Sequence, residues 1–150
     1  MKYIKMITKE TPLERGIKIW HPELSNLQIE LKDIGDNTII HSHTWIGKDV
    51  KIGSNVKIQA FSAIYDGVTI EDDVFIGPRV TTTNDAKLEV KGKEFWQKTL
   101  IKKGAKLGAC CAIKAGVTIG EGAIIGMGAI VLENIPDHEV WAGVPAKRIK

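Results

Sequence analysis

The sequence is poor in cysteine, in net charge and in long apolar segments, and each shortage excludes a class of protein. Cys110 and Cys111 are its only cysteines, and two adjacent residues cannot form the disulfide framework of a small secreted domain. The formal net charge of +3 is small and spread along the chain, whereas a nucleic-acid-binding protein would carry a concentrated basic face. No apolar stretch approaches a transmembrane span, and the first ten residues lack the apolar run of a signal peptide. We therefore expect a cytoplasmic protein that binds no nucleic acid and inserts into no membrane.

The most regular feature of the chain is an aliphatic residue at every sixth position. A small or β-branched residue follows four positions after each one, and glycine often comes directly after it. This period fits neither an amphipathic helix nor simple alternating strands, but it fits a short parallel strand and a corner, repeated. The aliphatic positions are Ile34, Ile40, Ile46, Ile52, Ile58, Ile64, Ile70 and Ile76 in the first run, and Ile101, Leu107, Ile113, Ile119, Ile125 and Val131 in the second.

Two inward positions per unit, one large and one small, suit a narrow triangular interior. Cys111 falls on a small inward position and is expected in the core. Three units close one coil, so the fourteen units predict an all-β, parallel β-helix prism of about five coils over residues 34–135. Because a solenoid exposes its ends, we expect residues 1–33, which include Pro12, to form an N-terminal cap, and residues 136–150 to form a C-terminal cap or tail.

The repeat is interrupted once, between Ile76 and Ile101, which lie 25 positions apart instead of the 24 that four units need. Residues 82–99 have no aliphatic register and predict a loop extruded from the prism. An excursion of this kind from a regular scaffold is more often functional than decorative. The loop carries Phe95 and Trp96, which need an apolar surface to cover them. That surface is either the loop's own prism or, in the interpretation that we favour, a neighbouring subunit.

Several segments in order narrow the assignment. They are IHSHTWIG (40–47), VKIQAFSAIYDGVTIEDDVFIGP (56–78), TTTND (81–85), KKGAKLGACCAIKAGVTIGEGAIIGMGAIV (102–131) and the ending WAGVPAKRIK (141–150). With these segments the chain resembles the hexapeptide-repeat acyltransferases of left-handed β-helix fold. Within them it is most similar to the nucleotide-sugar N-acetyltransferases that acetylate a 3-amino sugar linked to UDP or dTDP. The ending is shared with sugar O-acetyltransferases, so it marks the wider superfamily.

The resemblance implies a left-handed β-helix, acetyl-CoA as co-substrate and no metal. It also implies a homotrimer with active sites between subunits, where the extruded loop walls each site, and a role in surface-polysaccharide precursor synthesis. The sugar amine would attack the thioester directly. Such a transfer needs aligned reactants and hydrogen-bond donors for the developing oxyanion, and it depends less on a dedicated base than acetylation of a hydroxyl does.

Asn84 is the leading catalytic candidate, because it matches the Asn of the family's Phe-Thr-Asn motif, near the acceptor amine. Here the motif reads Thr82-Thr83-Asn84, so its aromatic residue is missing, and residues 86–88 lack the Pro-Arg that commonly follows. These departures leave the nucleotide and the sugar open. The alternative is a purely structural role, in which Asn84 and Asp85 only form the turn that leaves the strand.

Five further side chains are candidates at the substrate end of the site. By the two-residue alternation of a strand, His41 and His43 should both project outward, and either is a possible general base. Asp85 is an alternative base. Gln59 and Tyr65 replace glycine at corner positions, which indicates either substrate contacts or packing between subunits.

For acetyl-CoA, the resemblance implies that Ala109 and Met127 contact the pantetheine through their main chains. It also implies that Lys147, Arg148 and Lys150 meet the phosphates of the cofactor. A compact basic tail suits a phosphate-rich ligand, although it is also what a solubilising terminus looks like.

Three other functions remain as alternatives. A sugar or serine O-acetyltransferase would require His41 or His43 as a true base. A metalloprotein like the γ-class carbonic anhydrases needs three histidines around zinc, but His21 and His138 lie outside the regular repeat. A non-catalytic structural subunit is the third.

Overall fold

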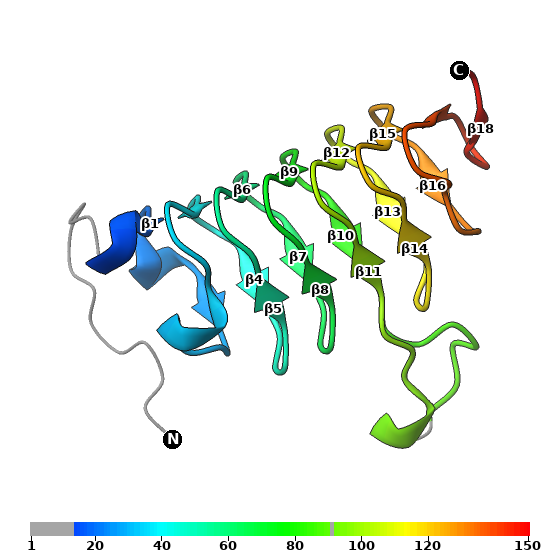
Figure 1. Ribbon diagram of the computed structural model, residues 1–150. Coiled ribbons are helices and arrows are strands. Elements are labelled where there is room, and N and C mark those ends of the chain that lie inside the picture. The colour runs from blue at the N-terminus through cyan, green and yellow to red at the C-terminus, as the bar shows by residue number, and fades with distance from the viewer. Residues whose placement is uncertain (1–13, 91) are drawn as a thin grey trace.

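Strands of two residues, stacked in three walls, build the fold (Figure 1). The computed structural model describes residues 14–90 and 92–150. Wall A contains β1 (Lys18–Ile19), β3 (Ile39–Ile40), β6 (Lys57–Ile58), β9 (Phe75–Ile76), β12 (Lys106–Leu107), β15 (Ile124–Ile125), β17 (Val140–Ala142) and β18 (Lys147–Arg148). Wall B contains β2 (Asn26–Leu27), β4 (Trp45–Ile46), β7 (Ala63–Ile64), β10 (Thr81–Thr82), β13 (Ala112–Ile113) and β16 (Ile130–Val131). Wall C contains β5 (Lys51–Ile52), β8 (Thr69–Ile70), β11 (Leu100–Ile101) and β14 (Thr118–Ile119).

The register between neighbouring strands confirms three units per coil. Ile40 pairs with Ile58 and Ile58 with Ile76, so that residues 18 positions apart lie one above the other. These pairings are parallel in all three walls, and only β18 runs antiparallel to its neighbour β17. The predicted all-β, parallel β-helix is therefore confirmed.

The number of coils is about seven rather than the expected five, because wall A stacks seven parallel strands from β1 to β17. The additional strands come from both ends of the chain, where the six-residue spacing is lost. Backbone pairing does not require that spacing: Lys18 pairs with Ile39, and Val140 pairs with Ile124. Residues 1–13, with Pro12 and the N-terminal segment, lie outside the described residues.

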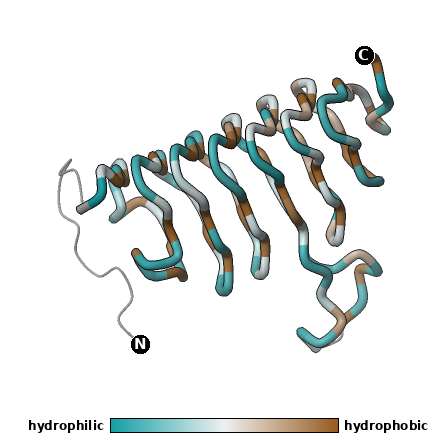
Figure 2. The backbone as a smooth tube through the Cα atoms, viewed as in Figure 1, coloured by the Kyte–Doolittle hydropathy of each residue, from teal (hydrophilic) through white to brown (hydrophobic). Residues whose placement is uncertain are grey.

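The interior of the prism is a continuous aliphatic column. Each residue of the six-residue ladder from Ile34 to Val131 is at most 4% exposed, and Figure 2 shows hydrophobic positions at matching places of successive coils. The small inward positions include polar side chains, whose hydroxyl groups donate to corner carbonyls, as from Ser62 to Gly77 at 3.0 Å. Cys111 lies on this column at 1% exposure, as expected, and burial raises the pKa of its thiol.

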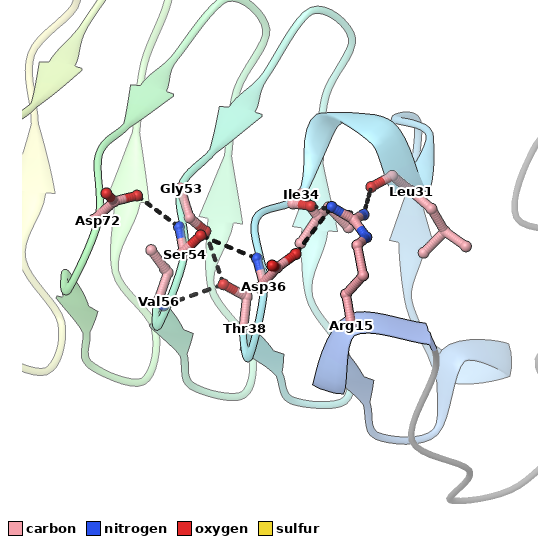
Figure 3. A network of polar contacts seen from close by, with 9 residues as sticks. All are labelled: Arg15, Leu31, Ile34, Asp36, Thr38, Gly53, Ser54, Val56 and Asp72. Atoms are coloured by element: carbon pink, nitrogen blue, oxygen red, sulfur yellow. Dashed lines mark hydrogen bonds and ion pairs between the residues drawn. The ribbon is translucent and has the colours of Figure 1, made fainter.

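Short 3-10 helices lie outside the walls, namely η1 (Glu14–Gly16), η2 (Pro22–Leu24), η3 (Leu31–Asp33) and η4 (Lys93–Phe95). Arg15 of η1 ties the start of the described chain to the first coil. Its guanidinium donates to the carbonyls of Leu31 and Ile34, at 2.7 and 3.0 Å, and pairs with Asp36 at 3.2 Å (Figure 3). No helix of residues 14–90 and 92–150 has the length and apolar character needed to cross a bilayer.

The interruption of the repeat forms the expected extruded loop, which leaves the prism after β10 and returns at β11 (Figure 1). The base of the loop is closed by a hydrogen bond of 2.9 Å from the amide of Gln97 to the carbonyl of Asn84. The apolar side chains of the loop stay largely outside the prism, since Leu88 is 89% exposed and Phe95 is 53% exposed. Trp96 is half-buried.

The two residues of strand β8 allow a direct test of the core. We expect Ile70→Ala to lower the free energy of unfolding by about 3 kcal/mol, because Ile70 is 1% exposed and no neighbour can fill the cavity. Thr69→Ala, on the outward side of the same strand, should change it by less than about 0.5 kcal/mol. Chemical denaturation followed by circular dichroism measures both values. Equal losses in the two variants would contradict the inward assignment of Ile70.

Candidate active site

Most turns of the prism contain a residue in the left-handed backbone conformation, and the three corners fill this position differently. Between walls C and A it holds Asn37, Asn55, Asp73, Gly104, Gly122 and, in the last coil, His138, and between walls B and C it holds Asp49, Gly67 and Gly116. Asn, Asp and Gly are the residues that tolerate this conformation. At the corner between walls A and B, here corner AB, it holds His43, Phe61, Arg79, Cys110 and Gly128. For a bulky residue the conformation costs roughly 1–2 kcal/mol, so corner AB carries side chains that the turn itself does not favour.

Three of these side chains form a stack along corner AB. The rings of His43 and Phe61 lie 4.5 Å apart at an angle of 18°, and the guanidinium carbon of Arg79 lies 5.9 Å from the centroid of Phe61. The three residues are 18 positions apart and therefore occupy the same place in successive coils. His43, Phe61 and Arg79 are all exposed, so the stack faces solvent in the single chain.

From the second coil to the sixth, corner AB carries no carboxylate side chain. Its segments there are 41–44, 59–62, 77–80, 108–111 and 126–129, all within the described residues, and none contains Asp or Glu. In the first coil, Glu23 lies in the connection from β1 to β2 and pairs with His21 at 3.2 Å. The other two corners are rich in acidic residues, among them Asp36, Asp49, Asp66, Asp72 and Glu121. An anionic ligand would therefore meet no repulsive side chain along these five segments of corner AB.

The main-chain amides at the corners differ in the same way. At the other corners, several of the amides two positions after the aliphatic residue donate to a side chain of an adjacent coil. Examples are the amide of Ser54, which donates to Asp72 of the next coil at 2.7 Å, and that of Lys103, which donates to Glu71 of the preceding coil at 2.8 Å; Figure 3 shows the first of them. The corresponding amides of corner AB belong to Ser42, Ala60, Ala109 and Met127, and within the described part of the chain they find no acceptor. Corner AB thus offers a row of free hydrogen-bond donors.

The two histidines of this corner do not share one orientation, contrary to the alternation expected from the sequence. His41 directly follows strand β3, while His43 has a positive φ of 58°, and a left-handed residue breaks the two-residue alternation. His43 is exposed on Phe61. His41 is half-buried beside Trp20, with ring centroids 6.3 Å apart, and its Nε2 is covered and has no hydrogen-bond partner among the described residues. Burial lowers the pKa of His41, and the nearby charge of Lys57 lowers it further.

The candidates from the sequence form two groups on the two sides of wall B. The first group lies along corner AB, in coils from the second to the sixth, and consists of His41, His43, Gln59, Ala109 and Met127. Tyr65, Asn84 and Asp85 lie on the opposite side, where wall B ends and the extruded loop begins. One chain therefore does not bring Asn84 to the histidines.

At the loop, the two neighbouring candidates have different surroundings. The carboxylate of Asp85 accepts the main-chain amides of Lys87, Leu88 and Glu89, at 2.9 to 3.1 Å, and so holds the first turn of the loop. Asn84 is half-buried, and its side chain makes no hydrogen bond within residues 14–90 and 92–150. The Asn84 amide is therefore available for a ligand, while the oxygens of Asp85 are engaged.

The loop is flanked by two hollows. One, of about 360 Å³, is mainly apolar and is lined by loop residues Asp85 and Leu88 and by wall B residues that include Ile130 and Leu132. The other, of about 210 Å³, lies between the loop and the earlier coils. It has a polar lining of Asp49, Asp66, Gly67, Lys93, Trp96, Gln97 and Lys98.

The basic residues expected to meet the cofactor lie at the C-terminal end of wall A. Lys147 pairs with Glu133 at 2.8 Å, and Arg148 pairs with Glu139 at 3.2 Å. Lys150 is exposed, and only its main chain is bonded, to Val140. The tail thus presents both exposed cations and their counterions. In the described part of the chain, no three His, Cys, Asp or Glu side chains cluster as metal ligands.

Sequence reasoning missed Phe61, Arg79 and Trp20, which the structure adds to this corner. The signal was present for two of them: Phe61 and Arg79 follow His43 at intervals of three units, which is one full coil each. Trp20 precedes the regular repeat, so no spacing could relate it to His41.

Comparison with known proteins identifies the repeat. The family model described as bacterial transferase hexapeptide (six repeats) matches residues 49–84 and 98–133. The serine acetyltransferase of Buchnera aphidicola subsp. Acyrthosiphon pisum is 40% identical over 110 residues, which are 72% of this chain and 36% of that protein. The galactoside O-acetyltransferase of Escherichia coli K12 is 32% identical over 126 residues, which are 78% of this chain and 62% of that protein. The chain therefore spans less than two thirds of the length of these relatives.

A solved structure matches nearly the whole fold. It is a mutant of AntD, an N-acyltransferase from Bacillus cereus, in complex with dTDP-4-amino-4,6-dideoxyglucose and coenzyme A. The TM-score is 0.72 at 25% sequence identity, and the match covers 89% of this chain and 79% of that one.

The environment of His41 predicts a pH dependence of stability. The unfolded chain protonates this histidine near its ordinary pKa of 6.5, whereas the folded chain does so only at lower pH. Below about pH 6.5 the unfolded state therefore binds more protons, and the free energy of unfolding falls as the pH falls through this range to the folded pKa. In His41→Asn, the loss between about pH 7 and pH 5 should be smaller than in the wild type.

Denaturant titrations across this pH range measure the effect, with His138→Asn as the control because His138 is exposed at the C-terminal end of the prism. An identical pH dependence in wild type and His41→Asn would show that burial of His41 has no consequence for its protonation.

Proposed function

We propose that this chain, whose residues 49–84 and 98–133 match the bacterial transferase hexapeptide model, is an acetyl-CoA-dependent N-acetyltransferase that acts on an amino group of a nucleotide-linked sugar. The observation that carries this proposal is corner AB from the second coil to the sixth (segments 41–44 to 126–129), where free main-chain donors and the absence of carboxylates occur together. Both proposed substrates are phosphorylated, and such a surface suits them. The cofactor also fits the residues expected to hold it, since the amides of Ala109 and Met127 are free to bind a polar chain.

The comparisons support each half of the proposal. Solved N-acyltransferases with coenzyme A have the same fold over 89% of this chain. The AntD complex contains an amino sugar on dTDP. AntD is also 25% identical to this chain in sequence, so the likeness is not one of fold alone. A GDP-perosamine N-acetyltransferase from Caulobacter crescentus, at 21% identity and a TM-score of 0.67, supports the fold.

In the proposed reaction, acetyl-CoA supplies the acetyl group as a thioester. The nitrogen of the sugar amine forms a bond to the carbonyl carbon, the carbon–sulfur bond breaks, and the amine proton leaves with the thiol of coenzyme A or with solvent. Asn84 would hold the amine through its side-chain amide. The free amides of corner AB, Ala109 in particular, would donate to the carbonyl oxygen as negative charge develops on it.

This site needs more than one copy of the chain. Wall B separates Asn84 from corner AB, and the apolar residues of the loop stay outside their own prism. In a homotrimer, the loop of one subunit would lie against corner AB of the next and complete the site between them. Cyclic assembly is a common way to cover such a surface.

The second candidate is O-acetylation of a sugar or of serine, and the two sequence relatives named above favour it. A hydroxyl acceptor needs a base, which is commonly oriented by a third group. Neither His41 nor His43 contacts a carboxylate in the described part of the chain. His43 has only the ring of Phe61 as its partner, and this geometry supports the amine acceptor better.

An acceptor panel tests the proposed reaction. We expect release of coenzyme A thiol from acetyl-CoA with UDP- or dTDP-linked amino sugars and little release with the matching hydroxyl sugars or with serine. Mass spectrometry of the product locates the acetyl group. Turnover with hydroxyl acceptors alone would replace this proposal by the O-acetyltransferase, and His43→Ala and His41→Ala would then identify its base.

The role of Asn84 predicts a specific loss. Asn84→Ala should lower kcat by at least about tenfold with an amino sugar, because one hydrogen bond to the reacting amine is lost. The matched control is Asn26→Ala, an exposed asparagine of the first strand in wall B. Unchanged kcat in Asn84→Ala, with both variants folded, would remove Asn84 from the reaction.

A further inference from the structure

We propose that Arg79, held in place by Phe61 and His43, binds the diphosphate of a nucleotide at corner AB. The inference rests on the proposed function, since nucleotide-linked sugars and coenzyme A both carry a diphosphate. It adds a binding residue that the sequence motifs do not indicate.

Arg79 differs from the other two arginines of the chain by having no counterion among the described residues. Arg15 pairs with Asp36, and Arg148 pairs with Glu139, at 3.2 Å each. Within residues 14–90 and 92–150, Arg79 faces only the ring of Phe61, and the corner AB segments of its own coil and of the two adjacent coils (59–62, 77–80 and 108–111) contain no carboxylate. An exposed guanidinium in such a place is available to an anion from outside the chain.

The stack also fixes the position of the guanidinium. Arg79 lies over one face of Phe61, and His43 lies against the same ring from the preceding coil. Contact with an aromatic ring occupies one face of a guanidinium and leaves its N–H edge open. That edge matches two oxygens of a phosphate, and little side-chain freedom remains to be lost on binding.

The neighbouring coil supplies further donors. The amide of Arg79 donates to the carbonyl of Ala60 at 3.1 Å, which places the corner of Ala60 directly beside that of Arg79. The free amide of Ala60 thus lies one coil away from the guanidinium. Charge and main-chain donors together are what a diphosphate requires.

The backbone provides an independent argument. Phe61 and Arg79 have φ angles of 63° and 58°, which are unfavourable for these residues, while the equivalent positions of the other corners hold mostly Asn, Asp or Gly. Strained residues are concentrated at functional sites, where the side chain is needed. Replacing either residue by Asn should therefore raise the melting temperature while weakening ligand binding.

Calorimetric titration of the full-length protein with UDP, dTDP and coenzyme A tests the proposal. The variants are Arg79→Lys, which keeps the charge without the planar fork, and Arg79→Asn and Phe61→Asn, which suit the left-handed conformation. Lys103→Gln is the control, because it removes one positive charge from a different corner. We expect Kd to rise about tenfold to a hundredfold in the Arg79 variants and less in Phe61→Asn, with no change in Lys103→Gln.

The choice of ligands identifies the source of the diphosphate. A loss confined to UDP or dTDP assigns Arg79 to the sugar nucleotide, and a loss confined to coenzyme A assigns it to the cofactor; both outcomes support the inference. Wild-type protein that binds none of the three, or Arg79 variants that bind all three within twofold of wild type, would overturn it.

The melting temperatures separate binding from folding. Arg79→Asn and Phe61→Asn that melt at or above the wild-type temperature but bind weakly exclude misfolding as the cause. The proposed reaction can fail separately, because loss of diphosphate affinity in Arg79→Lys stands even if no amine is acetylated. Acetylation with unchanged affinities in every variant would keep the proposed function and reject this inference.

Discussion

The backbone hydrogen bonds between successive coils are the constraint on which the rest of this protein depends. They fix a repeat of 18 residues, so that every position of a coil lies directly above its equivalent in the coil before. The neighbours of a side chain in such a structure are therefore fixed: they are the residues three units before and after it in the sequence. The aliphatic column, the asparagine and glycine corners and the stack of corner AB all result from this one rule. A function can be added only by changing the residue types along a column.

The three corners show how one backbone is specialised. At two of them, polar side chains accept hydrogen bonds from main-chain amides of the corner turns, as Asp66 does from the amide of Lys48 at 3.1 Å. Corner AB lacks these internal hydrogen bonds, and its residues Phe61 and Arg79 have unfavourable backbone φ angles. The stability lost there is small beside the contribution of the aliphatic column, in which each buried isoleucine contributes about 2 kcal/mol. The core therefore makes it possible for one corner to carry unfavourable backbone angles.

The sequence predicted the fold well because the dominant signal is strictly local. A six-residue spacing identifies the inward residues without knowledge of any contact, and it also located the extruded loop. It undercounted the coils because β1 and β17 pair through their backbones, which leave no side-chain signature. The orientation of His41 was missed for another reason: it depends on a left-handed turn at His43 and on Trp20, which lies outside the repeat. The stack of corner AB could be predicted from the sequence only by comparing residues three units apart, such as His43, Phe61 and Arg79.

The extruded loop gives a physical reason why several copies of such a regular scaffold would assemble to form the proposed site. Wall B places the loop and corner AB on opposite sides of the same chain, and two-residue strands are too short to bend one toward the other. The loop leaves Leu88 and Phe95 exposed, and solvent is an unfavourable environment for both. In the proposed homotrimer, a neighbouring copy of the chain would remove both difficulties at once, because it would cover the apolar side chains and bring Asn84 to a corner with free donors. The driving force for assembly and the completion of the site would then be the same contact.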